Sequence, residues 1–223
     1  MKIRVLGNFK TGTSSLLNIL ETNESSNDYT LLKGKHIACV KNADTIIVPI
    51  RKHYDIFISA FFQDIDKESY RYFYNKNRDI ILKEDNIKLV NFFKNIEWDK
   101  ESHLCFYEVM KHLNKYLIIE DEIIFGQCDK YVLKQFKSKD DGRLVNVLFI
   151  KFVYIKKEEV QKIFKDVFNF DIKFYKRFFH SNRGSDKWYS KKYNDFKLCL
   201  FKNGFDEYRD KYKYLDKNLF DYS

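Results

Sequence analysis

Short apolar runs alternate with longer segments of helical periodicity along this chain. Residues 2–6 and 145–155 are rich in branched apolar side chains, and residues 45–50 form an almost continuous apolar run, as in parallel strands buried on both faces. Residues 36–40 are a shorter candidate of the same type. These four segments are predicted to be strands.

Apolar side chains recur at helical spacing between and after these strands. The segment 13–21 begins with hydroxyl residues that can cap a helix, and the segment 54–62 carries its apolar side chains on one side. Helices are also predicted over 86–96, 100–116, 129–137, 157–168 and 190–214. Because strands alternate with helices, the sequence predicts a single α/β domain with a central parallel sheet flanked by helices.

The charge of the chain adds the expectation of an anionic partner. The 223 residues carry a formal net charge of +9, and the apolar content of 44% is sufficient to build a core around a binding site. Lysines are interleaved with acidic residues and form no block of the kind found in nucleic-acid-binding arms. A solvated lysine-rich surface explains the charge equally well, so charge alone does not decide the function.

Cysteines and apolar runs bear on the cell compartment. The four cysteines are far apart and form no CxxC pair, which indicates reduced thiols rather than disulfides or a zinc site. No signal-peptide pattern precedes the first predicted strand, and no apolar run approaches the roughly 18 residues of a membrane span. We expect a cytoplasmic protein without a membrane partner.

The most informative segment is 7–15, GNFKTGTSS, between a predicted strand and a predicted helix. Gly7 and Gly12 have the separation of the nucleotide-triphosphate loop G-x-x-x-x-G-K-[ST], and Ser14 occupies its hydroxyl position. Thr13 stands where that loop has its lysine. A glycine-permitted turn before a helix aims backbone N–H groups at an anion, so the segment predicts a phosphate site without the lysine of a triphosphate hydrolase.

The segment 10–16, KTGTSSL, closely resembles the 5′-phosphosulfate loop of sulfotransferases that use 3′-phosphoadenosine 5′-phosphosulfate (PAPS). The proline that usually precedes this loop in the family is Phe9 here. The resemblance implies that Lys10 stabilises the bridging oxygen during sulfuryl transfer. It also implies that the backbone N–H groups and hydroxyls of the following residues bind the 5′-phosphate, namely Thr11, Gly12, Thr13, Ser14 and Ser15.

The family has a second signature, an arginine that ends a strand and a serine on the following helix. Arg51 follows the apolar run 45–50, and Ser59 lies eight residues later, which is the family's R-x7-S spacing. The planar guanidinium suits a phosphate, and a serine two helical turns on could reach the same anion. The resemblance implies that Arg51 and Ser59 bind the 3′-phosphate, although Lys52 and His53 replace the family's usual aspartate and proline.

Two later segments resemble the family less closely. Residues 145–156 are similar to a late strand of the family, and residues 182–188, NRGSDKW, resemble a glycine-containing segment that closes over the cofactor. Arg183 and Gly184 match that segment and are further cofactor-binding candidates, but the spacing differs and one of the family's glycines is absent. A surface turn is the alternative for this segment.

A hydroxyl acceptor also requires a general base. His36 is the candidate, because it resembles a histidine at the same place in the family and because imidazole titrates near neutral pH. An ordinary histidine at a strand end is the alternative, and Glu21 or Glu24 could serve instead. His180 is a candidate for acceptor contact, and His53 is expected to make a local polar contact.

Together these features predict a P-loop-like sulfotransferase that transfers a sulfuryl group from PAPS to a hydroxyl acceptor, a carbohydrate or a small alcohol. Residues 1–65 and 143–190 would form the nucleotide-binding core, and residues 66–140 a helical cap on the acceptor side. No metal and no nucleic acid is expected to take part. Open α/β sheets bind ligands at the carboxyl ends of their strands, so both phosphate sites are expected there.

Three alternatives remain open. The first is a P-loop nucleotide or nucleoside kinase, which would use ATP with magnesium and a lysine directly after Gly12. The second is a protein that binds PAPS without catalysing transfer. The third is a basic binding module for nucleic acid or a sulfated polymer, which would gather its lysines and arginines on one face.

Overall fold

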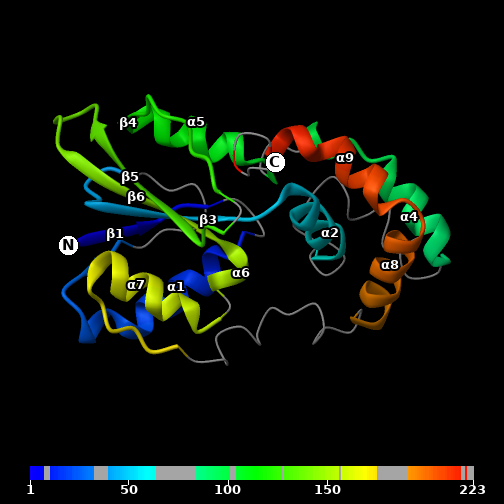
Figure 1. The fold of residues 1–223 in the computed structure, drawn as a ribbon, viewed down its shortest axis with the longest axis horizontal. Helices are drawn as coiled ribbons and strands as arrows, with labels where there is room; N and C mark the ends of the chain where they lie inside the picture. Colours follow the sequence, from blue (N-terminus) through cyan, green and yellow to red (C-terminus); the bar gives the residue numbers. More distant parts are fainter. Residues whose placement is uncertain are drawn as a thin grey trace.

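The computed structural model describes residues 1–7, 11–32, 40–63, 84–100, 104–126, 128–155, 157–174, 190–216 and 219. A six-stranded sheet with the order β2-β1-β3-β6-β5-β4 lies at its centre (Figure 1). The strands are β1 (Lys2–Val5), β2 (Thr30–Leu31), β3 (Thr45–Ile50), β4 (Leu117–Ile118), β5 (Tyr131–Ser138) and β6 (Leu144–Lys151). The pairings from β2 to β6 are parallel, and those of β5 with β6 and β4 are antiparallel.

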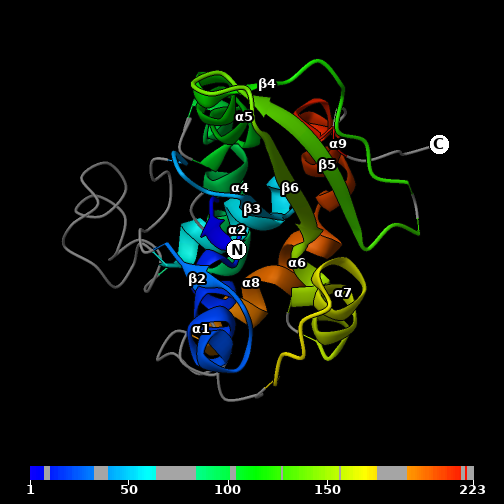
Figure 2. The same ribbon diagram turned by 90° about the vertical axis from the view of Figure 1, so that its left-hand side faces the viewer.

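Helices cover both faces of this sheet (Figure 2). On one face α1 (Thr13–Asn23) and α7 (Glu159–Phe168) pack on side chains such as Val5 and Ile47. On the other face α5 (Phe106–Tyr116) packs on the alternate side chains of the same strands, such as Val48. Every residue of β3 is buried, because its two faces are both covered. This explains why the segment reads as a continuous apolar run.

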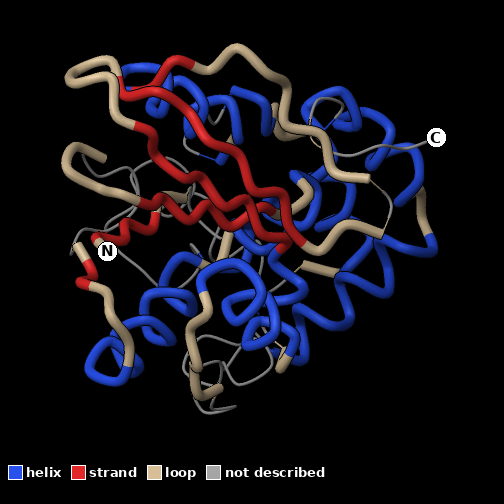
Figure 3. Tube along the Cα trace, turned by 60° about the vertical axis from the view of Figure 1, so that its left-hand side comes forward, coloured by secondary structure: helices blue, strands red, loops and turns tan. Residues whose placement is uncertain are grey.

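A third apolar cluster lies beyond the end of β3 and is formed mainly by helices (Figures 1 and 3). Its helices are α2 (His53–Gln63), α4 (Asn86–Lys94), α8 (Ser190–Lys202) and α9 (Phe205–Asp216), with the short 3-10 helix Trp98–Lys100. Aromatic rings fill it, and the rings of Phe57 and Trp98 stack at 5.4 Å with an angle of 11°. The cluster holds α2 firmly at its junction with the sheet.

Most of the predicted elements are confirmed, with limited changes at their ends. The predicted strand 145–155 is shorter than expected, because the chain turns after Lys151 into the short helix α6 (Phe152–Ile155). The predicted helix 190–214 is two helices, which Gly204 separates with a φ of +98°. A 3-10 helix (Glu24–Ser26) and β2 follow α1. The strand predicted over 36–40 lies outside the described residues except for its last position.

The helix predicted over 129–137 is wrong. This segment is β5, which pairs with β6 over seven residues and alternates partly in burial. The interval 66–140, expected to be helical, therefore also contributes β4 and β5 to the sheet. Among the helices that the structure describes, none is both long and apolar enough to cross a bilayer.

Candidate functional site

The carboxyl ends of three neighbouring parallel strands form the candidate site. Figure 1 shows β3 leading into α2 and β6 leading into α6 at the same end of the sheet. Gly7 follows β1 closely, Arg51 follows β3, and Phe152 follows β6. The parallel registers bring these three positions to one edge, which we call the carboxyl edge. Ligands of open α/β sheets bind at such an edge.

Gly7 allows Thr11 and Thr13 to lie close to the end of β1. A Cβ atom at Gly7 would lie 2.5 Å from Oγ1 of Thr13, 2.9 Å from Oγ1 of Thr11 and 3.0 Å from Cγ of Pro49. Both threonines are buried, and their hydroxyl oxygens lie 3.4 Å apart. The close approach explains why a glycine is needed here.

Pro49 is tolerated in this central strand because β1 ends before it. The carbonyl of Ile47 accepts a hydrogen bond from the backbone of Leu6 at 2.9 Å, and the last paired residue of β1 is Val5. The backbone groups of residue 49, like those of residue 47, point toward β1. Residue 49 lies beyond the end of that strand, so the missing N–H of proline removes no hydrogen bond between the two strands. The proline ring instead packs against the turn at Gly7.

Gly12 begins α1 in a conformation that favours glycine, with φ +98° and ψ +13°. Its carbonyl accepts the first helical hydrogen bond, from the N–H of Leu16 at 3.0 Å, and no side chain among the described residues caps this end of α1. The N–H groups of the first turn have no acceptor within the helix, and the helix dipole adds partial positive charge there. Ser14 is exposed and Ser15 is partly exposed at this end. The amino end of α1 is therefore suited to an anion.

The ring of Phe152 contacts both predicted phosphate sites. A Cβ atom at Gly12 would lie 2.5 Å from Cδ2 and Cε2 of this ring. The Cζ atom of Arg51 lies 4.7 Å from the ring centroid, a cation–π contact. Gly12 and Arg51 are thus on the same side of the strand ends, separated by one aromatic ring.

Arg51 is a partly buried cation. Burial lowers the pKa of its guanidinium, and the nearby Asp55 carboxylate partly offsets this, as do Tyr193 and Tyr54. An arginine remains protonated nevertheless. Because charges interact more strongly away from bulk water, the guanidinium is well placed to bind an anion tightly.

Lys151 adds a further positive charge that the sequence did not single out. It is the last residue of β6 and is in register with Ile50, the residue before Arg51. Its Nζ donates to the carbonyl of Gly126 at 3.1 Å. Burial lowers the pKa of Lys151, Asp129 opposes that change, and the neighbouring ammonium of Lys52 adds to it. The strand pattern alone could have placed Lys151 at the strand end, but only the pairing with β3 places it opposite Ile50, the residue before Arg51.

Several predicted site residues lie outside the described residues. They are Lys10, His36, Arg183, Gly184 and the acceptor-contact candidate His180. The roles assigned to them remain predictions. Ser59 is partly exposed and lies on α2, two helical turns beyond Arg51 as expected.

The structure disfavours Glu21 and Glu24 as the general base. They lie at the carboxyl end of α1, whose 11 residues extend about 15 Å from the candidate site at Gly12. An Oε1 atom of Glu24 also accepts a hydrogen bond from the N–H of Leu31 at 2.7 Å. His53, expected to make a local polar contact, instead binds Asp216, 163 residues later in the chain.

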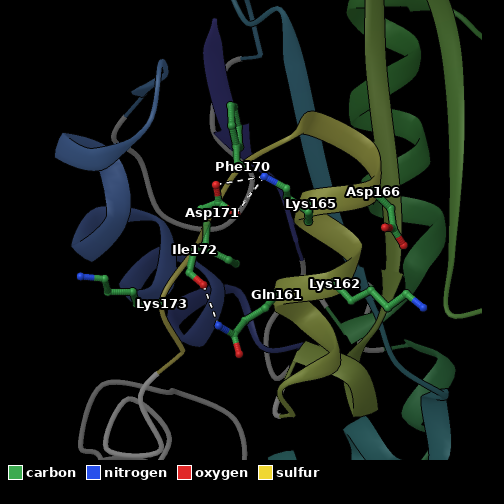
Figure 4. A pocket seen from close by; sticks show the side chains of 8 residues that line it. All are labelled: Gln161, Lys162, Lys165, Asp166, Phe170, Asp171, Ile172 and Lys173. Atoms are coloured by element: carbon green, nitrogen blue, oxygen red, sulfur yellow. Dashed lines mark hydrogen bonds and ion pairs between the residues drawn. The ribbon is translucent and has the colours of Figure 1, made fainter.

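A surface hollow of 390 Å³ lies apart from this site, between α7 and residues 170–173 (Figure 4). Lys165 pairs across it with Asp171 at 2.9 Å, and the side-chain amide of Gln161 donates to the carbonyl of Ile172 at 2.8 Å. None of its eight lining residues belongs to the carboxyl edge. The contacts of Lys165 and Gln161 hold the segment after α7 against that helix.

Comparisons of the chain with protein-family models, with curated proteins and with solved structures gave no match.

Proposed function

We propose that this protein is a sulfotransferase that uses PAPS as its sulfuryl donor. The observation that carries the proposal is the shared contact of Gly12 and Arg51 with the ring of Phe152. This contact supports the proposal because it brings the two candidate phosphate sites together at the carboxyl edge. A nucleotide with a phosphate on its ribose as well as on its 5′ position requires such a pair.

The described residues fit the two anionic groups of this nucleotide. The N–H groups of the first turn of α1 have no acceptor within the helix, so an anion can bind at this amino end. The 5′-phosphate would be held there, with Ser14 and Ser15 as the more accessible hydroxyls. Arg51 would hold the 3′-phosphate, with Ser59 on the following helix as the second predicted contact.

The nucleotide would supply the sulfuryl group, which passes to the oxygen of the acceptor hydroxyl. Sulfuryl transfer forms a new bond between sulfur and this oxygen and breaks the bond between sulfur and the bridging phosphate oxygen. Lys10 would balance the negative charge that develops on the phosphate, and His36 would take the proton of the hydroxyl. The amino end of α1 and Arg51 would contribute mainly by positioning.

A kinase is the second candidate, and the position after Gly12 argues against it. Thr13 stands there instead of a lysine, and its side chain is 4% exposed and turned toward Gly7 and Thr11. It cannot take the place of a lysine that reaches the terminal phosphate of a triphosphate.

Calorimetric titration with adenosine 3′,5′-bisphosphate and with ATP–Mg²⁺ tests the proposal. The unsubstituted protein should prefer the bisphosphate, and Arg51→Ala should weaken its binding by about 2 kcal/mol or more, the scale for removing one partner of a desolvated charge pair. Arg143→Ala is the matched control, because Arg143 pairs with Asp44 at 3.1 Å at the opposite end of the strands. Equal affinity for both nucleotides, or equal losses in the two arginine variants, would refute the proposal.

A further inference from the structure

A buried histidine–carboxylate pair lies next to Arg51. The Nδ1 atom of His53 is 2.5 Å from Oδ1 of Asp216, and each side chain is 1% exposed. The Nε2 atom of His53 accepts a hydrogen bond from the backbone N–H of Phe106 at 3.0 Å. The three residues come from the beginning of α2, the end of α9 and the beginning of α5.

Both ring nitrogens of His53 are used within the protein, which excludes this side chain from proton transfer to a substrate. A backbone N–H can only donate, so Nε2 is the unprotonated nitrogen and Nδ1 carries the proton that Asp216 accepts. The imidazole is therefore neutral and fixed in one tautomer. The pair has a structural task rather than a chemical one.

That task is to cap two helices at once from distant parts of the chain. The carboxylate of Asp216 also accepts the backbone N–H of His53, at 3.2 Å, and so binds the amino end of α2. The imidazole in turn binds the first N–H of α5, where Cys105 provides no side-chain cap. Carboxylates and other acceptors at helix amino ends stabilise both the N–H groups and the dipole.

The link from this pair to Arg51 is short. Only Lys52 separates Arg51 from His53. The carbonyl of Lys52 accepts hydrogen bonds from the N–H groups of Asp55 at 3.1 Å and Ile56 at 3.2 Å. The first turn of α2 is thus held by Asp216 on one side and by the backbone of residue 52 on the other. The direction in which the chain leaves β3, and hence the place of the guanidinium, depends on how this turn is fixed.

We propose that His53 and Asp216 are positioning residues that hold Arg51 in place for the ribose 3′-phosphate. The inference rests on the proposed function, since it assigns the pair to the same nucleotide site. Loss of the pair would lower the affinity for a 3′-phosphorylated nucleotide and leave the binding of the 5′-phosphate largely unchanged. A pair that served stability alone would affect both groups alike.

The test compares the affinities for adenosine 3′,5′-bisphosphate and adenosine 5′-monophosphate in the full chain. Asp216→Asn keeps the size of the side chain but removes its charge. It should reduce the preference for the bisphosphate about fivefold or more, which is the scale of the interaction between residues of one hydrogen-bond network. His53→Gln keeps one donor and one acceptor but cannot reproduce the geometry of the ring, so it should cause a smaller loss of the preference; it is the second variant if Asp216→Asn does not fold. In an Arg51→Ala background, Asp216→Asn should cause no further loss of the preference.

Asn23→Ala is the matched control for the loss of a buried, long-range polar contact. Asn23 is 1% exposed and binds the backbone of Lys173 through both side-chain polar atoms, at 2.6 and 3.0 Å, at the far end of α1. This variant should lower the unfolding temperature and keep the full preference for the bisphosphate.

The outcomes separate the inference from the function that it rests on. If the unsubstituted protein shows no preference for the bisphosphate, the proposed function fails and the positioning role fails with it. If the preference exists and Arg51→Ala abolishes it, but Asp216→Asn and His53→Gln retain it in full, the function stands and the positioning role is refuted. A further loss in the double variant would also refute it, because the pair would then act independently of Arg51.

Discussion

Replacing Gly12 with alanine should destabilise the protein more than the same substitution at the other glycines with positive φ. The residue has a φ of +98°, and an added Cβ would lie 2.5 Å from two carbon atoms of the Phe152 ring. We expect Gly12→Ala to destabilise the fold for two separable reasons, one in the backbone and one in the contact with the ring.

The magnitude of each part follows from the geometry. A left-handed conformation costs an L-residue about 1–2 kcal/mol. Overpacking typically costs about 1–3 kcal/mol, and the ring cannot move away freely because it also contacts the guanidinium of Arg51. The free energy of unfolding should therefore fall by about 2–5 kcal/mol in Gly12→Ala.

Unfolding in urea measures this change, and Gly204→Ala separates the two parts. Gly204 has the same φ of +98°, but the atom nearest to its added Cβ is Nζ of Lys94 at 2.8 Å, the mobile end of a long side chain. Its substitution should show mainly the backbone cost. If Gly12→Ala costs no more than Gly204→Ala, the ring does not lie on Gly12, and the argument that joins the two anion sites is wrong.

Two further substitutions test neighbouring parts of the account. Phe152→Leu should weaken binding of adenosine 3′,5′-bisphosphate, because it removes the cation–π contact with Arg51, which is worth about 0.5–2 kcal/mol. It should also restore part of the stability lost in Gly12→Ala. Additive effects of the two substitutions on stability would contradict the contact between the ring and Gly12. Asn23→Ala should lower the free energy of unfolding in urea by about 1–3 kcal/mol, because it removes the two hydrogen bonds between the buried Asn23 side chain and the backbone of Lys173, and a change below about 0.5 kcal/mol would contradict this.

The sequence predicted those elements whose burial leaves a local pattern. The run 45–50 was recognisable as a strand because helices cover both of its faces. β5 was not recognisable, because its apolar residues Val132, Leu133 and Phe136 have the spacing of one face of a helix. What makes it a strand is its pairing with β6, which lies outside any local window.

The residues of the candidate site also fall into those that local sequence marks and those that only strand pairing brings together. Gly12 and Arg51 were predicted, since each is marked by its own neighbours in the chain. Phe152 and Lys151 were not, because their closeness to these residues depends on β6 lying beside β3. The contact of His53 with Asp216 spans 163 residues and carries no spacing signal at all.

A crystal structure of the complex with adenosine 3′,5′-bisphosphate tests the central claim most directly. The account predicts the 5′-phosphate at the amino end of α1 and the 3′-phosphate at the guanidinium of Arg51, with Phe152 between them. A nucleotide bound with its 3′-phosphate away from Arg51, or bound in the hollow beside α7, would contradict it.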